Sequence, residues 1–271
     1  MKYGLRFYIK QFGYWVERFF KNLMFPKRNV RPVIITGNQK SGTSAIVSLL
    51  GLATNKTFIV DVFYRMGLYE EKLIEKNKSF RDFIQDSRCY LNYEIIKEPE
   101  FILFLDDLRG IYPDSTIVYI IRDPFENIRS ILNRLDISSS EAQKLTSIDT
   151  PAVRNSPLWN LLTSSQMPYQ GENLFEKLVN RWLFSISEFE KLPEDNVILV
   201  KYEDFKENKV EFIHTLATNL GFSIKNDFSS MLNYNFQPKG TSVVKEEFFS
   251  KGQIEYINSK CGNEMQKYGY K

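Results

Sequence analysis

The 271-residue chain has few of the residues that build metal centres and disulfide frameworks. It contains two cysteines and one histidine, His214, and no Cys-x-x-Cys or Cys/His spacing typical of zinc sites. We therefore expect no bound metal, and a reducing, cytoplasmic setting is the simplest interpretation. The sequence leaves open whether Cys89 and Cys261 pair.

Long hydrophobic runs and a strong excess of one charge are also absent. No stretch reaches the roughly 18 apolar residues of a membrane span. The N-terminus lacks the apolar core and cleavage site of a signal peptide. The net charge of +3 is too small to indicate a nucleic-acid partner, although it is compatible with a local basic pocket for an anion. The length and the 43% of hydrophobic residues predict one globular domain.

The most informative stretch spans residues 32–50. The β-branched run Val33–Ile35 predicts a buried parallel strand, a glycine-containing turn follows, and a helical apolar pattern begins near Thr43. A strand, a glycine turn and a helix N-terminus together form a phosphate site, because free backbone N–H groups and the helix dipole point at the anion. Gly37 and Gly42 have the spacing of a nucleoside-triphosphate loop, but Thr43 stands where that loop has its lysine.

The lysine lies three positions earlier, so Lys40-Ser-Gly-Thr-Ser44 resembles the 5′-phosphosulfate loop of sulfotransferases, whose core is K-x-G-T. Those enzymes use 3′-phosphoadenosine 5′-phosphosulfate (PAPS) and release 3′,5′-ADP (PAP). The resemblance implies a cofactor-binding loop made of Gly37, Asn38, Gln39, Lys40, Ser41, Gly42, Thr43 and Ser44. The alternative is a glycine-rich turn before a core helix, with Lys40 in solvent.

A second stretch carries the same resemblance. Residues 115–121 predict another buried strand, and Asp123 and Pro124 predict the start of a helix. Sulfotransferases carry R-D-P-x-x-x-x-x-S in such a unit, and its Arg and Ser hold the nucleotide 3′-phosphate. The resemblance assigns these roles to Arg122 and Ser130, where the alternatives are a surface ion pair and a helix filler. Lys239 and Gly240, in a basic glycine turn, are weaker candidates for the same phosphate.

The resemblance also bears on the general base. Small-molecule sulfotransferases carry K-T-H at a strand end, with His as the base, whereas heparan-type members carry K-E with Glu as the base. This chain has Lys97-Glu98, which favours Glu98, although a charged turn is the alternative. Tyrosylprotein sulfotransferases place a catalytic carboxylate at about the distance of Asp61 from the loop. Asp61 is therefore the reserve candidate, with a helix N-cap as its alternative role.

Two other segments lack a clear assignment. Residues 5–24 form an aromatic and basic amphipathic pattern. We expect this helix to pack on the domain or on another subunit, with contact with a membrane surface as the alternative. Between residues 136 and 171 the periodicity fades, and we interpret this region as a loop that covers the substrate, lined by Trp159 and Tyr169.

We therefore predict an α/β fold with a central parallel sheet flanked by helices, as in P-loop-like sulfotransferases. An N-terminal helix in residues 1–30 precedes a single domain in residues 31–271. The predicted reaction moves a sulfuryl group from PAPS to a hydroxyl or amine of a glycan, glycolipid or other small molecule, with Lys40 and a carboxylate as catalytic groups. The alternatives are a P-loop nucleotide kinase or NTPase and a non-catalytic nucleotide-binding member of the family.

Overall fold

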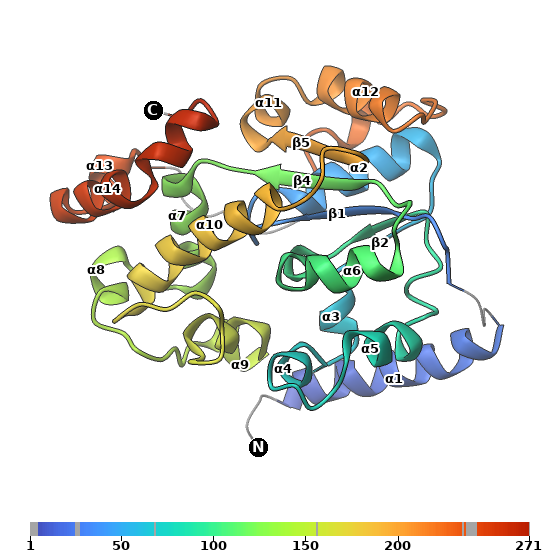
Figure 1. The fold of residues 1–271 in the computed structure, drawn as a ribbon, viewed down its shortest axis with the longest axis horizontal. Helices are drawn as coiled ribbons and strands as arrows, with labels where there is room; N and C mark the ends of the chain where they lie inside the picture. The colour runs from blue at the N-terminus through green and yellow to red at the C-terminus, as the bar shows by residue number, and fades with distance from the viewer. Residues whose placement is uncertain are drawn as a thin grey trace.

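The computed structural model describes residues 5–24, 28–67, 69–155, 157–234, 236 and 243–270. Its centre is a parallel sheet of five strands in the order β2-β3-β1-β4-β5 (Figure 1). The strands are β1 (Val33–Gly37), β2 (Phe58–Val60), β3 (Ile95–Lys97), β4 (Ile117–Ile121) and β5 (Val197–Lys201). The predicted α/β fold with a central parallel sheet is confirmed.

The central strands of the sheet are buried on both faces because helices cover each of them. Alternate residues of a strand point to opposite faces, and the central strands divide their side chains accordingly. Ile34, Ile96 and Tyr119 enter one apolar cluster, whereas Ile35, Ile95 and Val118 enter the other. The near-continuous apolar runs in β1 and β4 therefore reflect two cores, as expected for a parallel sheet.

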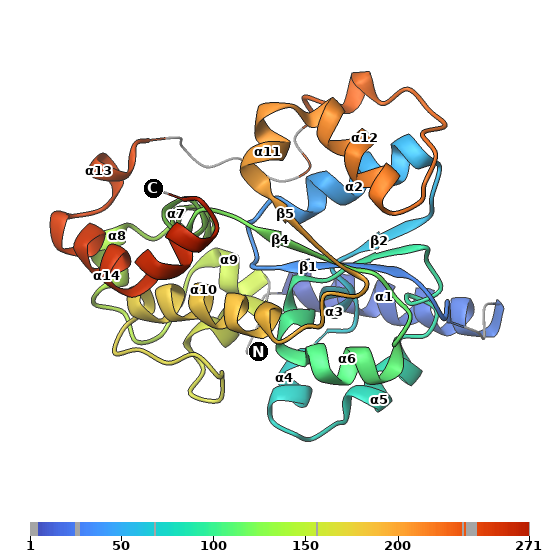
Figure 2. The same cartoon turned by 45° about the horizontal axis from the view of Figure 1, so that its top comes forward.

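Figures 1 and 2 show the helices that form the two layers. One face is covered by α2 (Thr43–Thr54), α11 (Tyr202–Glu207) and α12 (Lys209–Asn219). The other face carries the larger cluster, which includes residues of α3 (Val62–Arg65), α5 (Phe80–Asp86), α6 (Leu105–Ile111), α7 (Pro124–Leu135), α10 (Leu174–Glu190) and α14 (Lys251–Lys267). The short elements are α4 (Tyr69–Ile74), η1 (Pro99–Phe104), η3 (Ser229–Met231) and α13 (Lys245–Phe248).

The region interpreted as a substrate-covering loop contains short helices. They are α8 (Ser139–Ala142), α9 (Pro151–Asn155) and η2 (Pro157–Thr163). Ser138 and Glu141 form a capping box, which fixes the start of α8. Each helix is too short to show a periodic pattern in the sequence. The segment is therefore more ordered than its fading periodicity suggested.

The first helix, α1 (Leu5–Met24), lies alongside α3 and α5, on the face of the sheet opposite α2 (Figures 1 and 2). It packs on the domain mainly through polar contacts. Gln11 donates a hydrogen bond to the carbonyl oxygen of Tyr64 at 2.7 Å, and Tyr90 donates one to the carbonyl oxygen of Tyr14 at 3.1 Å. Within the described residues, no helix has the length and apolar character needed to cross a bilayer.

Candidate active site

The loop between β1 and α2 has the backbone shape of an anion-binding turn. Gly37, Lys40 and Gly42 all have positive φ angles, of 136°, 67° and 80°. A Cβ on Gly37 would lie 2.3 Å from the carbonyl oxygen of Ile120, so only glycine fits beside β4. Residues with positive φ in such a turn direct backbone N–H groups toward one concave side, and the N-terminus of α2 adds its dipole there.

The end of β4 and the first turn of α7 hold this loop in place. Arg122 donates a hydrogen bond from Nη1 to the carbonyl oxygen of Lys40 at 2.6 Å. Asn127 donates to the carbonyl oxygen of Gln39 at 2.8 Å and to Oγ of Ser41 at 3.0 Å. The two sequence motifs, more than 80 residues apart, are therefore joined by direct hydrogen bonds.

Arg122 is fixed on several sides. Its Nη2 donates to Glu126 at 3.1 Å, and its guanidinium lies 4.5 Å from the centre of the Tyr202 ring. The carbonyl oxygen of Arg122 accepts a hydrogen bond from Trp182 Nε1 at 2.9 Å. Its Nε is buried and has no hydrogen-bond partner within the described chain. A rigid guanidinium with an unpaired buried donor suits recognition of a phosphate.

The rest of the predicted 3′-phosphate site is only partly described. Ser130 is half-buried on α7, about two turns along from Arg122, and it does not line the cavity described below. Arg129, beside it, donates a hydrogen bond to the carbonyl oxygen of Val243. Lys239 and Gly240 lie outside the described residues. The roles of Ser130, Lys239 and Gly240 therefore stay predictions.

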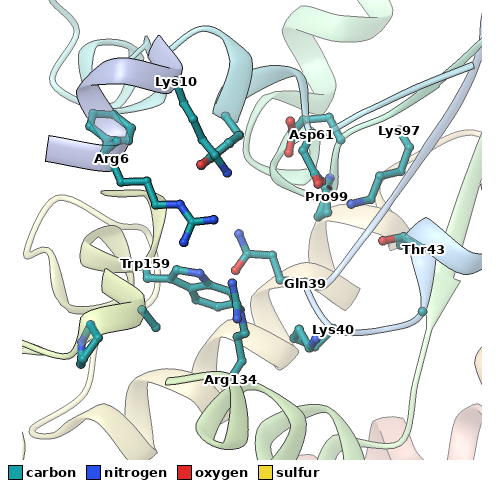
Figure 3. Close-up of a pocket in the computed structure, with 16 residues that line it drawn as sticks. Arg6, Lys10, Gln39, Lys40, Thr43, Asp61, Lys97, Pro99, Arg134 and Trp159 are labelled. Carbon is teal, nitrogen blue, oxygen red and sulfur yellow. Dashed lines mark hydrogen bonds and ion pairs between the residues drawn. The ribbon is translucent and has the colours of Figure 1, made fainter. Parts of the chain in front are cut away.

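A cavity of about 610 Å³ opens beside the loop (Figure 3). The loop contributes Gln39, Lys40, Gly42 and Thr43 to its wall, and the ends of β2 and β3 contribute Asp61, Lys97 and Glu98. Trp159 from η2 also lines it, whereas the substrate-covering role of this segment stays a prediction. Tyr169 does not line it, because its ring is 3% exposed and packs with Leu161 and Met167.

Asp61 and Lys97 form an ion pair on the cavity wall. Lys97 Nζ donates to Asp61 Oδ1 at 2.5 Å. The Lys97 side chain is 2% exposed, whereas that of Asp61 is 42% exposed. Asp61 has φ of 57° at the start of α3, and its side chain makes no capping hydrogen bond. The structure therefore removes the N-cap interpretation of Asp61 and leaves an accessible carboxylate.

Glu98 lies next to this pair but is enclosed. It is 2% exposed, and its two carboxylate oxygens accept hydrogen bonds from the backbone N–H groups of Phe63, at 2.9 Å, and Glu100, at 3.3 Å. Burial and the nearby Asp61 carboxylate raise the pKa of Glu98 to about 8. Glu98 therefore caps η1 and ties β3 to α3 through both of its oxygens.

Lys40 experiences the opposite effect. Burial, together with the positive charges of Arg134, Arg122 and Lys97, lowers the pKa of Lys40 to about 8. When no anion is bound, the cavity therefore disfavours the protonated, positively charged form of Lys40. An anionic group bound beside Lys40 would reverse that effect.

Sequence reasoning missed a buried support behind the loop. Arg181 of α10 pairs with Glu100 at 2.8 Å and donates to Asn38 Oδ1 at 3.1 Å, and both partners of the pair are nearly inaccessible. It also missed Arg6, Lys10 and Arg134, which line the cavity. None belongs to a local motif. Only the amphipathic pattern of residues 5–24, with its basic residues, gave a signal for Arg6 and Lys10.

Other features of the site concern metals and thiols. Within the described residues, no group of three or more His, Cys, Asp or Glu side chains is arranged to hold a metal ion. Cys89 and Cys261 are both buried and do not pair with each other. The chemistry of the cavity therefore has to be argued from its lysines, arginines, carboxylates and backbone N–H groups.

A comparison with family models decides the classification. The model described as the sulfotransferase family matches residues 52–226, which is more than half of the chain. The chain belongs to the sulfotransferase family. The matched range begins after the loop at residues 37–44, so the loop is a separate indication of the same family. The predicted family is confirmed.

Solved structures show the same fold. Sulfotransferase STF9 from Mycobacterium avium matches with a TM-score of 0.55 and 12% identity over 89% of this chain and 77% of its own. A sulfotransferase from Alicyclobacillus acidocaldarius matches with a TM-score of 0.52 and 12% identity over 89% and 97% of the two chains. Mouse sulfotransferase SULT7A1, complexed with PAP, matches with a TM-score of 0.50 and 13% identity over 88% and 86%. A search of curated proteins found no match.

Proposed function

We propose that this sulfotransferase moves a sulfuryl group from PAPS to a hydroxyl, or an amine, of its acceptor. The observation that carries the proposal is the left-handed loop around Lys40, hydrogen-bonded to Arg122 and Asn127 of the second motif. A nucleoside-triphosphate loop needs a lysine directly after its last glycine, and this chain has Thr43 at that position, after Gly42. The unpaired Nε of Arg122 fits a phosphate of PAPS, and the positive φ angles of Lys40 and Gly42 suit a loop that turns N–H groups toward an anion.

The residues of the cavity have distinct roles in this proposal. Bound PAPS supplies the sulfuryl group. The loop N–H groups and the α2 N-terminus hold the 5′-phosphosulfate, and Arg122, with Ser130, selects the 3′-phosphate that ATP lacks. Lys40 neutralises the charge that develops on the phosphate oxygen when its bond to sulfur breaks, while the acceptor oxygen forms the new bond to sulfur.

We assign the proton transfer to Asp61 in preference to Glu98. Lys97 engages only Oδ1 of Asp61, and within the described chain Oδ2 has no hydrogen-bond donor. Oδ2 is therefore available to take the acceptor proton. Both oxygens of Glu98 already accept backbone hydrogen bonds, and the side chain is 2% exposed. Glu98 then acts as a structural support for the pair, which reverses the order expected from Lys97-Glu98.

The acceptor and the setting complete the proposal. The cavity beside Asp61 and Trp159 has room for a glycan unit, a glycolipid headgroup or another small molecule, since about 610 Å³ lies within the range of small-molecule sites. We keep the cytoplasmic location predicted from the sequence, with peripheral membrane contact through residues 5–24. Cell fractionation with and without a carbonate wash tests both points, and secretion of the protein would contradict them.

Calorimetry with PAP and with ATP plus Mg²⁺ tests the donor site. We expect metal-independent binding of PAP that is lost in Arg122→Ala and kept in Lys225→Ala, whose side chain is exposed at the C-terminal end of α2, opposite the loop. Lys40→Ala should lose about 3–4 kcal/mol of transition-state stabilisation in radiolabelled sulfuryl transfer. A preference for ATP with Mg²⁺ would favour the nucleotide kinase alternative, and PAP binding without turnover on any acceptor would favour a non-catalytic member.

A comparison of carboxylate variants tests the base. Asp61→Asn should lower kcat by roughly 10²- to 10⁴-fold with unchanged PAP affinity. Glu98→Gln should leave the kcat of the folded enzyme within a few-fold, and Asp107→Asn, at an exposed site on α6, serves as the control. Loss of turnover in Glu98→Gln with an active Asp61→Asn would return the base to Glu98.

A further inference from the structure

Three cationic side chains line the cavity on the side of Trp159, and one of them, Arg134, also lies close enough to lower the pKa of Lys40. Arg6 and Lys10 come from α1, and Arg134 comes from the last turn of α7. Figure 3 shows them on the side of Trp159, across the cavity from Lys97 and Thr43. The short helix α9 packs against both α1 and α7, which brings the two elements together. Residues 128 positions apart thus share one wall.

These cations have little to balance them within the protein. No carboxylate of the described chain pairs with Arg6, Lys10 or Arg134, whereas Glu17 on α1 pairs with Lys21 and Arg65. The carboxylates on the cavity wall are Asp61, which is paired with Lys97, and the enclosed Glu98. Burial raises the pKa of the Tyr64 hydroxyl, and the positive charges of Arg6 and Arg134 both oppose that rise. The charges therefore converge on one region and leave it positive.

We infer that this wall is an acceptor subsite for an anionic group, which rests on the proposed function. The acceptor is then a hydroxyl compound that already carries a carboxylate, sulfate or phosphate. Lys40, Arg122 and the loop serve the donor, so the cations on α1 and at the end of α7 remain for the acceptor. Trp159 beside them offers an aromatic wall for a sugar ring or another ring.

Phenyl β-glucuronide and phenyl β-glucoside test this inference, because they differ in one carboxylate. Binding of each to the PAP-saturated protein is measured by calorimetry, so turnover is not needed. We expect the glucuronide to bind roughly tenfold more tightly, and Arg6→Gln/Lys10→Gln/Arg134→Gln to remove that preference. The control Lys225→Gln/Lys251→Gln/Lys260→Gln changes the net charge equally at exposed sites and should keep it.

The other outcomes overturn the inference. Equal or weaker binding of the glucuronide, or no detectable binding of it at millimolar concentration, removes the anionic subsite. Weaker PAP binding in the cavity triple variant would assign the cations to the nucleotide. A failure of PAP to bind the wild type would instead refute the proposed donor, and glucuronide binding to the free protein would still be measurable.

A second inference stands on the opposite side of α1. The helix turns its polar residues toward the domain and its large apolar residues outward, and of its side chains only Phe7 is buried. Phe12, Trp15, Phe19 and Phe20 are 67%, 54%, 54% and 58% exposed. The outward rings contact one another, with centroids 6.0 Å apart for Phe12 and Trp15 and 6.2 Å for Trp15 and Phe19. A continuous apolar face of this kind marks a contact surface.

We propose that this face binds the surface of an anionic membrane. Residues 5–24 carry four basic side chains and one acidic side chain, so the helix has a net charge of +3. Lys21 pairs with Glu17, whereas Arg6 and Lys10, near the first turns of the helix and beside the cavity, stay exposed. Aromatic residues with flanking cations suit the lipid interface. A second copy is a poorer occupant, because a 20-residue helix is about 30 Å long and 10–12 Å wide. One face then offers roughly 300 Å², against about 800 Å² per partner in a stable dimer.

Tryptophan fluorescence gives a direct readout. The chain has three tryptophans, of which Trp159 and Trp182 are buried, so a shift on binding vesicles reports Trp15. We expect a blue shift and co-flotation with phosphatidylcholine vesicles that contain about 30% phosphatidylglycerol, and much less with phosphatidylcholine alone. Phe12→Ser/Phe19→Ser should abolish co-flotation without unfolding, since both rings are exposed.

Leu199→Ser/Val210→Ser, which alters exposed apolar side chains elsewhere, is the control and should bind as the wild type does. Absence of binding to anionic vesicles overturns the membrane proposal. So does a stable dimer in analytical ultracentrifugation that Phe12→Ser/Phe19→Ser converts to a monomer, because the face would then be a subunit interface.

Discussion

Gly42 is the position where the loop, Tyr202 and Arg122 meet, and its replacement by alanine probes all three. A Cβ on Gly42 would lie 2.2 Å from two carbons of the Tyr202 ring, and the φ angle of +80° disfavours any side chain. The backbone strain costs about 1–2 kcal/mol. Displacement of the ring from the Arg122 guanidinium, 4.5 Å away, removes a cation–π contact of about 0.5–2 kcal/mol.

We therefore expect Gly42→Ala to lower the free energy of unfolding by roughly 1.5–4 kcal/mol, measured by urea denaturation. PAP affinity, measured by calorimetry, should fall by about 2- to 30-fold, because the loss of the contact frees Arg122 from its stacked position. Gly110→Ala is the matched control. A Cβ there meets nothing within 4 Å, and alanine is the better helix former on α6.

A double-mutant cycle separates the strain from the clash. In a Tyr202→Ala background the ring is gone, so Gly42→Ala should cost only the backbone strain of about 1–2 kcal/mol. The two substitutions should therefore cost less together than the sum of their separate effects. Strictly additive costs would refute the contact between Gly42 and Tyr202 as the cause, and unchanged PAP affinity would refute the role of Tyr202 in holding Arg122.

Three further predictions follow from buried charges. Arg181→Met should destabilise the fold by roughly 3–5 kcal/mol in urea denaturation, because it leaves Glu100 buried and unpaired. The double variant Arg181→Met/Glu100→Gln should recover part of that loss, and equal stability of the single and double variants would contradict this explanation. PAP affinity should fall as the pH rises through about 8, where Lys40 loses its proton. Lys40→Met should flatten this pH dependence. An identical slope in the wild type and in Lys40→Met would exclude Lys40 as its cause. The raised pKa of Glu98, about 8 in the folded state, means that unfolding releases a proton between about pH 5 and 8. Stability should therefore fall with rising pH by up to about 1.4 kcal/mol per unit, and Glu98→Gln should abolish that slope.

The sequence predicted the loop between β1 and α2 and the start of α7 because their signals are local. A β-branched run, a glycine turn and a helix start lie within 20 residues of one another. In the second motif, Asp123-Pro124 predicted the start of α7. The structure shows the predicted cap, since Asp123 accepts a hydrogen bond from the N–H of Glu126. The contacts of Tyr202 and Glu203 with this unit were not predicted. Tyr202 nevertheless stacks on Arg122, and Glu203 accepts a hydrogen bond from the N–H of Asp123 at 3.1 Å.

The buried support behind the loop and the basic side of the cavity could not be predicted, because contacts between residues far apart in the sequence assemble them. Arg181 bonds to Asn38 across 143 residues, and Arg6 and Arg134 line the same cavity because α9 packs against both of their helices. Nothing in the local pattern around these residues distinguishes them from solvated charges. The order of Glu98 and Asp61 as base candidates also depends on burial, which the pattern Lys97-Glu98 does not report.

The first helix shows why pattern and orientation are separate questions. Its amphipathic sequence predicted packing on the domain, and it does pack there, but with the polar side inward, where Gln11 and Asn22 bond to the domain. Its other side therefore stays apolar and exposed. The same helix supplies Arg6, Phe7 and Lys10 to the cavity wall. Because one element forms both surfaces, removal of residues 5–24 would open the acceptor side of the cavity as well as delete the apolar face, so the helix cannot be treated as a detachable anchor.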